Sequence, residues 1–219
     1  DVVAAMAAEG GCPISTGERL LAVDRDGAPL RLTTDRRTIE TDHVVLACSL
    51  VPLRSVRFTP ELPVALRSAI DDLGYGTVTK TAVQWPRRSW PTGFVNTTTR
   101  SQRVYEPTVD QPGEAGVLMA YTGGDGGRWL AGHVEAERIR MVVGDQRLIH
   151  GLTGDPIAAV SRAWSSEPRF GGSYAVYRPG QVTAHWQVLR EPCGAVHLAG
   201  EHVATCTGYL EGALESGDA

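Results

Sequence analysis

A segment near the end of the chain, residues 195–217, combines residue types that suit a polar ligand. The run Ala195–Gly200 is apolar enough for a buried strand, Glu201 follows it, and helical spacing begins near Gly208. Glycine lets a ligand approach the backbone closely, and a carboxylate accepts hydrogen bonds from hydroxyl groups. Free N–H groups at a helix start favour a phosphate or a carbonyl oxygen. The segment therefore indicates a site for an anionic or polyhydroxylated ligand, although the same residues also fit a plain strand–loop–helix connection.

Lys80 is a second candidate for chemistry, because it is the only lysine among the 21 basic residues of the chain. It falls in the run 77–85, TVTKTAVQW, whose alternation of small and larger side chains predicts a β-strand. The preference for arginine elsewhere is typical of a GC-rich coding sequence. Lysine offers a compact ammonium whose protonation responds to burial, which the delocalised guanidinium does not match. The single lysine therefore indicates a position that needs an ammonium, although chance also leaves one lysine somewhere.

The elements that must position these residues fall into three blocks. The first is α/β in character, with a helix end at 1–9, a hairpin of residues 19–25 and 29–34, and a strand at 43–48 that we expect to be buried on both faces. The second is mixed, with strands at 77–85, 117–121 and 170–180, helices at 59–73, 134–143 and 155–164, a polar loop and edge strand at 96–110, and a glycine cluster at 123–127. The third returns to a buried strand and a helix. This order predicts an α/β fold with a mixed α+β insert, arranged as two interleaved domains.

The composition argues against several classes of partner. The 219 residues are 42% apolar and 21% charged, which is ordinary for one large or two small globular domains. The net charge is −4 and no basic stripe is visible, so we expect no nucleic-acid partner. No apolar run approaches the roughly 20 residues of a membrane span, so we expect no membrane association.

The four cysteines have neither CxxC nor zinc-ligand spacing, so we expect free thiols and no metal site. The small number of cysteines and the absence of a signal-peptide pattern in the first residues point to the cytoplasm, with secretion left open.

Four segments, taken in order, resemble one protein family. They are TDHVVLACSLVPLRSVRFTPELP (41–63), YGTVTKTAVQW (75–85) with Trp90 shortly after it, WSSEPRFGGSYAVYRPG (164–180) and HLAGEHVATCTGYLEGALESG (197–217). Over nearly its whole length the chain resembles the C-terminal half of the flavin-containing amine oxidases, the family of monoamine, polyamine and L-amino-acid oxidases. The resemblance implies that residues 1–58 and 188–219 belong to an FAD-binding Rossmann-like domain, interleaved with a substrate-binding domain with a mixed sheet at 59–187.

The resemblance also implies roles for single residues on the substrate side. Lys80 falls on the family's lysine, which holds a water against flavin N5, where a cation helps to stabilise the reduced flavin. Tyr174 and Tyr209 fall on the two aromatic positions that flank the substrate amine. Two facing rings orient an amine and exclude water, although Tyr174 also fits core packing and Tyr209 a helix start.

On the cofactor side, Glu201 falls on the acidic residue that contacts the ribityl or pyrophosphate region. Gly200, Thr207 and Gly208 line the same wall, and Leu21 falls where the family uses backbone groups against the adenine end. Ser173 stands where some members carry the cysteine that is joined covalently to the flavin. A hydroxyl does not form that thioether, so we expect non-covalent FAD.

The chain departs from the family in one larger respect, because it contains no G-x-G-x-x-G loop to hold the pyrophosphate. An open sheet without its first βαβ unit exposes apolar edges. We therefore expect a second polypeptide that carries this fingerprint, made by cleavage or by a split gene.

The activity that the resemblance implies is FAD-dependent oxidation of an amine or L-amino acid to the imine. A hydride equivalent passes to flavin N5. Dioxygen then reoxidises the flavin and is itself reduced to hydrogen peroxide. Two alternatives stay open: a desaturase or protoporphyrinogen-type oxidase of the same fold, which tends to lack the lysine and the tyrosine pair, and a non-catalytic supporting subunit. The sequence does not identify the substrate, since Arg103 and Arg178 fit either a carboxylate contact or a surface charge.

Overall fold

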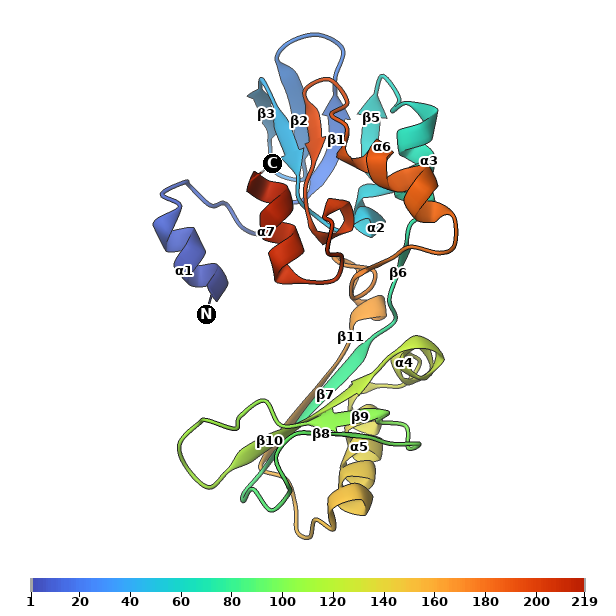
Figure 1. Ribbon diagram of the computed structural model, residues 1–219. Helices are drawn as coiled ribbons and strands as arrows, with labels where there is room; N and C mark the ends of the chain where they lie inside the picture. Colours follow the sequence, from blue (N-terminus) through green and yellow to red (C-terminus); the bar gives the residue numbers. More distant parts are fainter. Residues whose placement is uncertain (1, 219) are drawn as a thin grey trace.

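The structure is a computed structural model that describes residues 2–218, and it has two lobes joined by a narrow waist (Figure 1). The first lobe is built from both ends of the chain, and the second from its middle. Each lobe has its own cluster of buried apolar side chains. The structure thus contains the α/β and mixed α+β parts that the sequence predicts.

A four-stranded sheet forms the outer part of the first lobe, in the order β3-β2-β1-β5. Its strands are β1 (Leu20–Asp24), β2 (Leu30–Thr34), β3 (Thr38–Thr41) and β5 (Arg57–Thr59). The expected hairpin is confirmed, because β1 and β2 pair in antiparallel fashion; β5 then joins β1 in parallel. Strands β3 and β5 were not predicted, since both are short.

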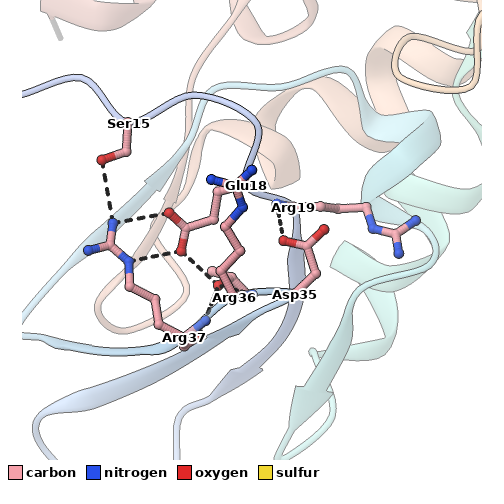
Figure 2. Close-up of polar contacts among 7 residues, drawn as sticks. Ser15, Glu18, Arg19, Asp35, Arg36 and Arg37 are labelled. Carbon is pink, nitrogen blue, oxygen red and sulfur yellow. Dashed lines mark hydrogen bonds and ion pairs between the residues drawn. The ribbon is translucent and has the colours of Figure 1, made fainter.

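An ion pair fixes the chain where it enters this sheet (Figure 2). The Glu18 carboxylate accepts hydrogen bonds from Arg37 Nε at 2.9 Å and Nη2 at 3.1 Å, and from the Thr34 hydroxyl at 2.7 Å. The backbone N–H of Arg19 donates to Asp35 at 3.0 Å. The hydrogen bond from Arg37 is the largest cause that lowers the pKa of Glu18. These contacts tie the segment before β1 to the turn between β2 and β3.

The rest of the first lobe packs short helices against a pair of parallel strands, β4 (Val44–Leu46) and β13 (Val196–Leu198). The helices are α2 (Leu50–Leu53), α3 (Val64–Asp72), a π-helical turn (Val182–Trp186) that runs into α6 (Gln187–Arg190), a 3-10 turn (Glu201–Val203) and α7 (Leu210–Asp218). Strand β4 was expected to be buried on both faces. That expectation is wrong, because Leu46 is buried but Val45 is 60% exposed.

Helix α1 (Val2–Glu9) confirms the predicted helix at the start of the chain, and Figure 1 shows it apart from both lobes. None of its residues is buried. Helix α3 was predicted from residue 59, but it begins at Val64 because β5 runs to Thr59 and Pro63 occupies the N-cap position.

A five-stranded antiparallel sheet forms the second lobe, in the order β11-β7-β10-β9-β8. Its strands are β7 (Thr79–Trp85), β8 (Phe94–Asn96), β9 (Arg103–Tyr105), β10 (Gly116–Thr122) and β11 (Ala158–Ala163). Side chains of β7 and β10 alternate strictly between buried and half-buried positions, as expected for a sheet covered on one face. Helices α4 (Gly124–Ala131) and α5 (Glu135–His150) lie beside this sheet (Figure 1).

One prediction for this lobe needs correction, and one helix was not predicted. Residues 155–164 were expected to be helical, but they form β11, which pairs with β7, and the 3-10 turn Trp164–Ser166. The sequence of β11, AAVSRA, contains helix-forming alanines, but pairing along the edge of β7 overrides that local preference. The glycine cluster at 123–127 lies mostly within α4, whose Gly124 and Gly127 carbonyls accept hydrogen bonds from Thr77 and Thr79.

The chain crosses between the lobes twice, and the two crossings are held together. Strands β6 (Gly74–Tyr75) and β12 (Ala175–Val176) pair in antiparallel fashion. The Gly76 N–H donates to the Tyr174 carbonyl at 2.8 Å, and the Ser173 N–H donates to the Gly76 carbonyl at 2.9 Å. A Cβ at Gly76 would lie 2.6 Å from Ser173 Oγ, so only glycine permits this approach.

The core of the second lobe contains a buried amide, that of Gln146. We expect the substitution Gln146→Met to lower the stability of the protein. Gln146 is fully buried, accepts a hydrogen bond from Trp85 Nε1 at 2.8 Å and donates to the Leu118 carbonyl at 3.1 Å. Methionine fills similar space but leaves both partners unpaired, which costs about 3 kcal/mol. Urea unfolding measures the change. Gln187→Met on the exposed face of α6 is the control, and equal stability of the two variants contradicts this assignment.

Candidate active site

A cavity of about 1560 Å³ opens at the waist between the lobes. Its wall combines strand residues of the second lobe with two loops of the first, which precede β12 and follow β13. Residues with reactive or aromatic groups on this wall are Lys80, Tyr121, Trp164, Phe170, Ser173, Tyr174, Tyr177, Trp186, Thr205, Thr207 and Tyr209. The cavity is larger than the roughly 300–1,000 Å³ of common small-ligand pockets, so it has room for a ligand of cofactor size.

Lys80 reaches this cavity from the half-buried face of β7. The register of the sheet places it directly opposite Tyr121 on β10, so both side chains lie on the same face. The ammonium nitrogen lies 5.2 Å from the centroid of the Tyr121 ring, within the range of a cation–π contact. The Tyr121 hydroxyl lies 3.4 Å from the Tyr174 hydroxyl, which is a long hydrogen bond.

Burial is the largest cause that raises the pKa of Tyr121 far above its usual value, and the hydrogen bond to Tyr174 adds to it. Burial also raises the pKa of Tyr177 to about 12. The Tyr177 hydroxyl donates to the carbonyl of His202 at 2.6 Å. These phenols are therefore neutral hydrogen-bond donors at neutral pH.

Tyr174 and Tyr209 come from different segments, and Gly208 lies between them in space. A Cβ on Gly208 would lie 3.7 Å from the Tyr174 ring, an ordinary van der Waals distance, so this glycine faces that ring. Tyr209 is 67% exposed at the start of α7. The two rings border the same cavity, as the site prediction requires, and Tyr209 has room to move.

Glu201 acts within the chain as a latch between these segments. One carboxylate oxygen accepts the N–H of Ala175 at 2.8 Å, and the other accepts the N–H of Gly208 at 2.8 Å. The carboxylate therefore fixes the loop before α7 to β12. Each oxygen keeps a second lone pair, so each can still accept a hydrogen bond from a hydroxyl group of a ligand.

Gly200 and His202 form a tight corner behind the cavity. Gly200 has a φ of +133°, and a Cβ there would lie 2.7 Å from the His202 ring. The His202 side chain is buried, its Nε2 has no partner within residues 2–218, and burial lowers its pKa to about 4. The imidazole is therefore neutral at physiological pH.

The structure gathers most of the predicted site residues. Six of them line the cavity: Lys80, Ser173, Tyr174, Thr207, Gly208 and Tyr209. Gly200 and Glu201 stand behind its wall, and Leu21 on β1 lies outside it. Tyr121 was missed. The signal in the sequence was an aromatic residue at the end of the strand predicted at 117–121. That signal was not enough, because the position of Tyr121 opposite Lys80 depends on the pairing of two strands 41 residues apart.

The arrangement can hold a flat, polar cofactor beside an amine. Gly208, which has a positive φ, and the N-terminal end of α7 leave the backbone accessible at the cavity. The ammonium of Lys80 and the tyrosine rings supply charge and aromatic faces in the same cavity. Within the described residues there is no cluster of three or more His, Cys, Asp or Glu side chains that could hold a metal ion. Among the helices of residues 2–218, none is long and apolar enough to cross a membrane.

Replacing the latch carboxylate, Glu201→Gln, should loosen the loop before α7. The amide presents one acceptor instead of two, so either Ala175 or Gly208 loses its partner. We expect the backbone amide that loses its partner to exchange with deuterium about tenfold faster, because hydrogen bonds to charged groups are worth more than about 1 kcal/mol. Glu211→Gln, on the exposed first turn of α7, is the matched control. Unchanged exchange at both amides contradicts the latch.

The buried imidazole of His202 should make stability depend on pH. Its folded pKa of about 4 lies below the unfolded value of about 6.5. The unfolded chain therefore binds a proton first, so stability falls as pH drops from 6.5 to 4, by about 3 kcal/mol in total. Unfolding free energies at several pH values measure this loss. His202→Leu should remove that part of the slope, and an identical slope in the variant rejects the assignment.

Comparisons with known proteins identify the family of this chain. The family model described as flavin-containing amine oxidoreductase matches residues 1–219. A flavin-dependent L-tryptophan oxidase, RebO, of Lentzea aerocolonigenes is 30% identical over 93% of this chain and 46% of its own length. An L-amino-acid oxidase of Bungarus fasciatus is 24% identical, over 91% of this chain and 41% of its own.

Solved structures show the same fold. Putrescine oxidase bound to putrescine superposes with a TM-score of 0.88 at 20% identity, over 99% of this chain and 50% of that one. Cyclohexylamine oxidase from Brevibacterium oxydans gives a TM-score of 0.79 at 23% identity, over 90% and 46%. The chain thus spans about half the length of the relatives it matches. The family model covers the whole chain and the solved structures share its fold, and the chain belongs to the family of flavin-containing amine oxidoreductases.

Proposed function

We propose that this chain forms the substrate-facing part of an enzyme that oxidises an amine or an L-amino acid to the imine with FAD. The observation that carries the proposal is that Lys80, Tyr174 and Tyr209 line the same cavity, together with Thr207 and Gly208 of the loop before α7. The names of the relatives support this substrate class, since they include L-tryptophan, L-amino-acid and putrescine oxidases.

The residues of this chain that would hold FAD are Gly200, Glu201, Thr207 and Gly208. When bound, FAD supplies the acceptor for the hydride equivalent and the electrons that reduce dioxygen to hydrogen peroxide. We propose that the cofactor is held without a covalent bond. The Ser173 hydroxyl supports this, because it has no thiol chemistry and already donates to the Gly76 carbonyl at 3.0 Å.

The side chains of the cavity have distinct tasks in this proposal. The rings of Tyr174 and Tyr209 orient the substrate nitrogen and keep water away from it. The ammonium of Lys80 disfavours a second cation nearby, so the substrate amine binds in its neutral form. The substrate then loses a hydride equivalent from carbon and a proton from nitrogen, and no strong base in this chain is required.

We propose that polypeptide carrying a G-x-G-x-x-G loop forms the remaining wall of the site. We propose a second chain, produced by cleavage or by a split gene, as its source. The exposed apolar side chains Val2 and Met6 of α1, a helix without any buried residue, support a covering partner. A desaturase of the same fold is the second candidate. Lys80, Tyr174 and Tyr209 argue against it, because enzymes of that kind tend to lack the lysine and the tyrosine pair.

Lys80→Met should abolish most of the oxidase activity of the FAD-loaded enzyme. Loss of a charge that acts on the reacting centre typically costs about 10²–10³ in rate. A hydrogen peroxide assay over a panel of amines and L-amino acids measures it. Arg162→Met removes a cation from the neighbouring strand, directly opposite Lys80, and is the matched control.

Two results would reject the proposal. The first is a wild-type enzyme with bound FAD that oxidises no amine or amino acid in the panel. The second is a Lys80→Met variant as active as Arg162→Met. Acid precipitation separately tests the cofactor linkage, since non-covalent FAD stays in the supernatant.

A further inference from the structure

Tyr121 joins two residues of the proposed site and has no role of its own in that proposal. It lies directly opposite Lys80 in the register of β7 and β10, on the cavity face of the sheet. Its ring centroid is 5.2 Å from Lys80 Nζ, and its hydroxyl is 3.4 Å from the Tyr174 hydroxyl. One side chain therefore touches both the cation and one of the two rings.

The ammonium of Lys80 has no carboxylate partner among residues 2–218. None of the ion pairs in this part of the chain involves it, and none of the side-chain hydrogen bonds does. Its cross-strand neighbour on the other side is Arg162 on β11, which carries the same charge. A free lysine side chain has about 2 kcal/mol of rotamer entropy to lose before it adopts one position.

We infer that Tyr121 is a positioning residue: its ring holds the ammonium of Lys80 over the cavity, and its hydroxyl links that position to Tyr174. The effect of Tyr121 on catalysis rests on the proposed function. The contact between Tyr121 and Lys80 is independent of that function. The ring contact with Lys80 is the stronger of the two contacts, because a 3.4 Å separation is long for a hydrogen bond between hydroxyls.

Packing alone does not explain a tyrosine at this position. Tyr121 is only half-buried and its side chain lies on the cavity face, whereas its strand neighbours Ala120 and Thr122 face the buried side of the sheet. A ring at the open face gains little from core burial. It gains from the cation above it, since a cation–π contact strengthens as water is excluded.

Two substitutions separate the ring from the hydroxyl. Tyr121→Phe keeps the ring and should keep Lys80 in place, with at most an about fivefold effect on rate through Tyr174. Tyr121→Leu removes the ring and should release Lys80. Tyr105→Leu is the matched control, because Tyr105 lies on the same face of the sheet on β9, one row away, opposite Met119.

The first readout is independent of catalysis. In the FAD-loaded enzyme with isotope-labelled lysine, the protons next to Lys80 Nζ should be shifted upfield by the ring current of Tyr121, with Lys80→Arg identifying the signal. The shift should persist in Tyr121→Phe and Tyr105→Leu and vanish in Tyr121→Leu. A shift that survives in Tyr121→Leu overturns the inference, whatever reaction the enzyme catalyses.

The second readout is a double-mutant comparison of rates. Tyr121→Leu should slow the same step as Lys80→Met, by about tenfold, and should have no further effect when Lys80 is already methionine. If the two effects multiply, or if the Tyr121→Leu loss lies only in substrate KM, Tyr121 does not act through Lys80 and the inference is wrong. Failure of the amine assay in the wild-type enzyme rejects the proposed function but leaves the spectroscopic result standing.

Discussion

The cavity depends on the backbone hydrogen bonds at the waist of the molecule. Two chain crossings run side by side there, and Gly76 exchanges hydrogen bonds with Ser173 and Tyr174 at 2.8–2.9 Å. Lys80 lies four residues beyond Gly76 on one crossing, and Tyr174 lies on the other. The distance between the cation and the aromatic ring is therefore set by backbone pairing, which is stiffer than side-chain packing. Glu201 adds a third segment to this junction, because its carboxylate binds backbone amides of β12 and of the loop before α7.

How much of this could be predicted differs between the lobes for a physical reason. The strand around Lys80 was predicted because small and larger side chains alternate along it, and Val117–Tyr121 was predicted as a short apolar run; in the structure both strands bury one face. Residues 158–163 carry no such signal, since AAVSRA is small and helix-compatible, and only the free edge of β7 makes it a strand. Helix α4 was missed because four of its first five positions, counting its N-cap, are glycine, which locally disfavours helix.

The candidate site shows the same limit. Residues that share a short motif, such as Ser173 with Tyr174 or Thr207 with Gly208, could be singled out because local sequence carries the motif, and all four line the cavity. Tyr121 belongs to no motif. Its place beside Lys80 arises from the antiparallel register of β7 and β10, and a shift of one residue would turn it to the opposite face. Contacts of this kind are fixed by the pairing of distant segments, which a single sequence does not display.

An aromatic partner for Lys80 also has an electrostatic consequence. A carboxylate at the same place would hold the ammonium more strongly, but it would cancel most of the positive charge seen by the rest of the cavity. The face of a tyrosine ring attracts the cation while carrying no net charge. Because burial raises the pKa of Tyr121, the phenol stays neutral at neutral pH and does not cancel the positive charge beside it. A cation held in place without a carboxylate partner is able to stabilise negative charge that develops beside it. A ring in place of a carboxylate thus gives up some local attraction and preserves the positive field in the cavity.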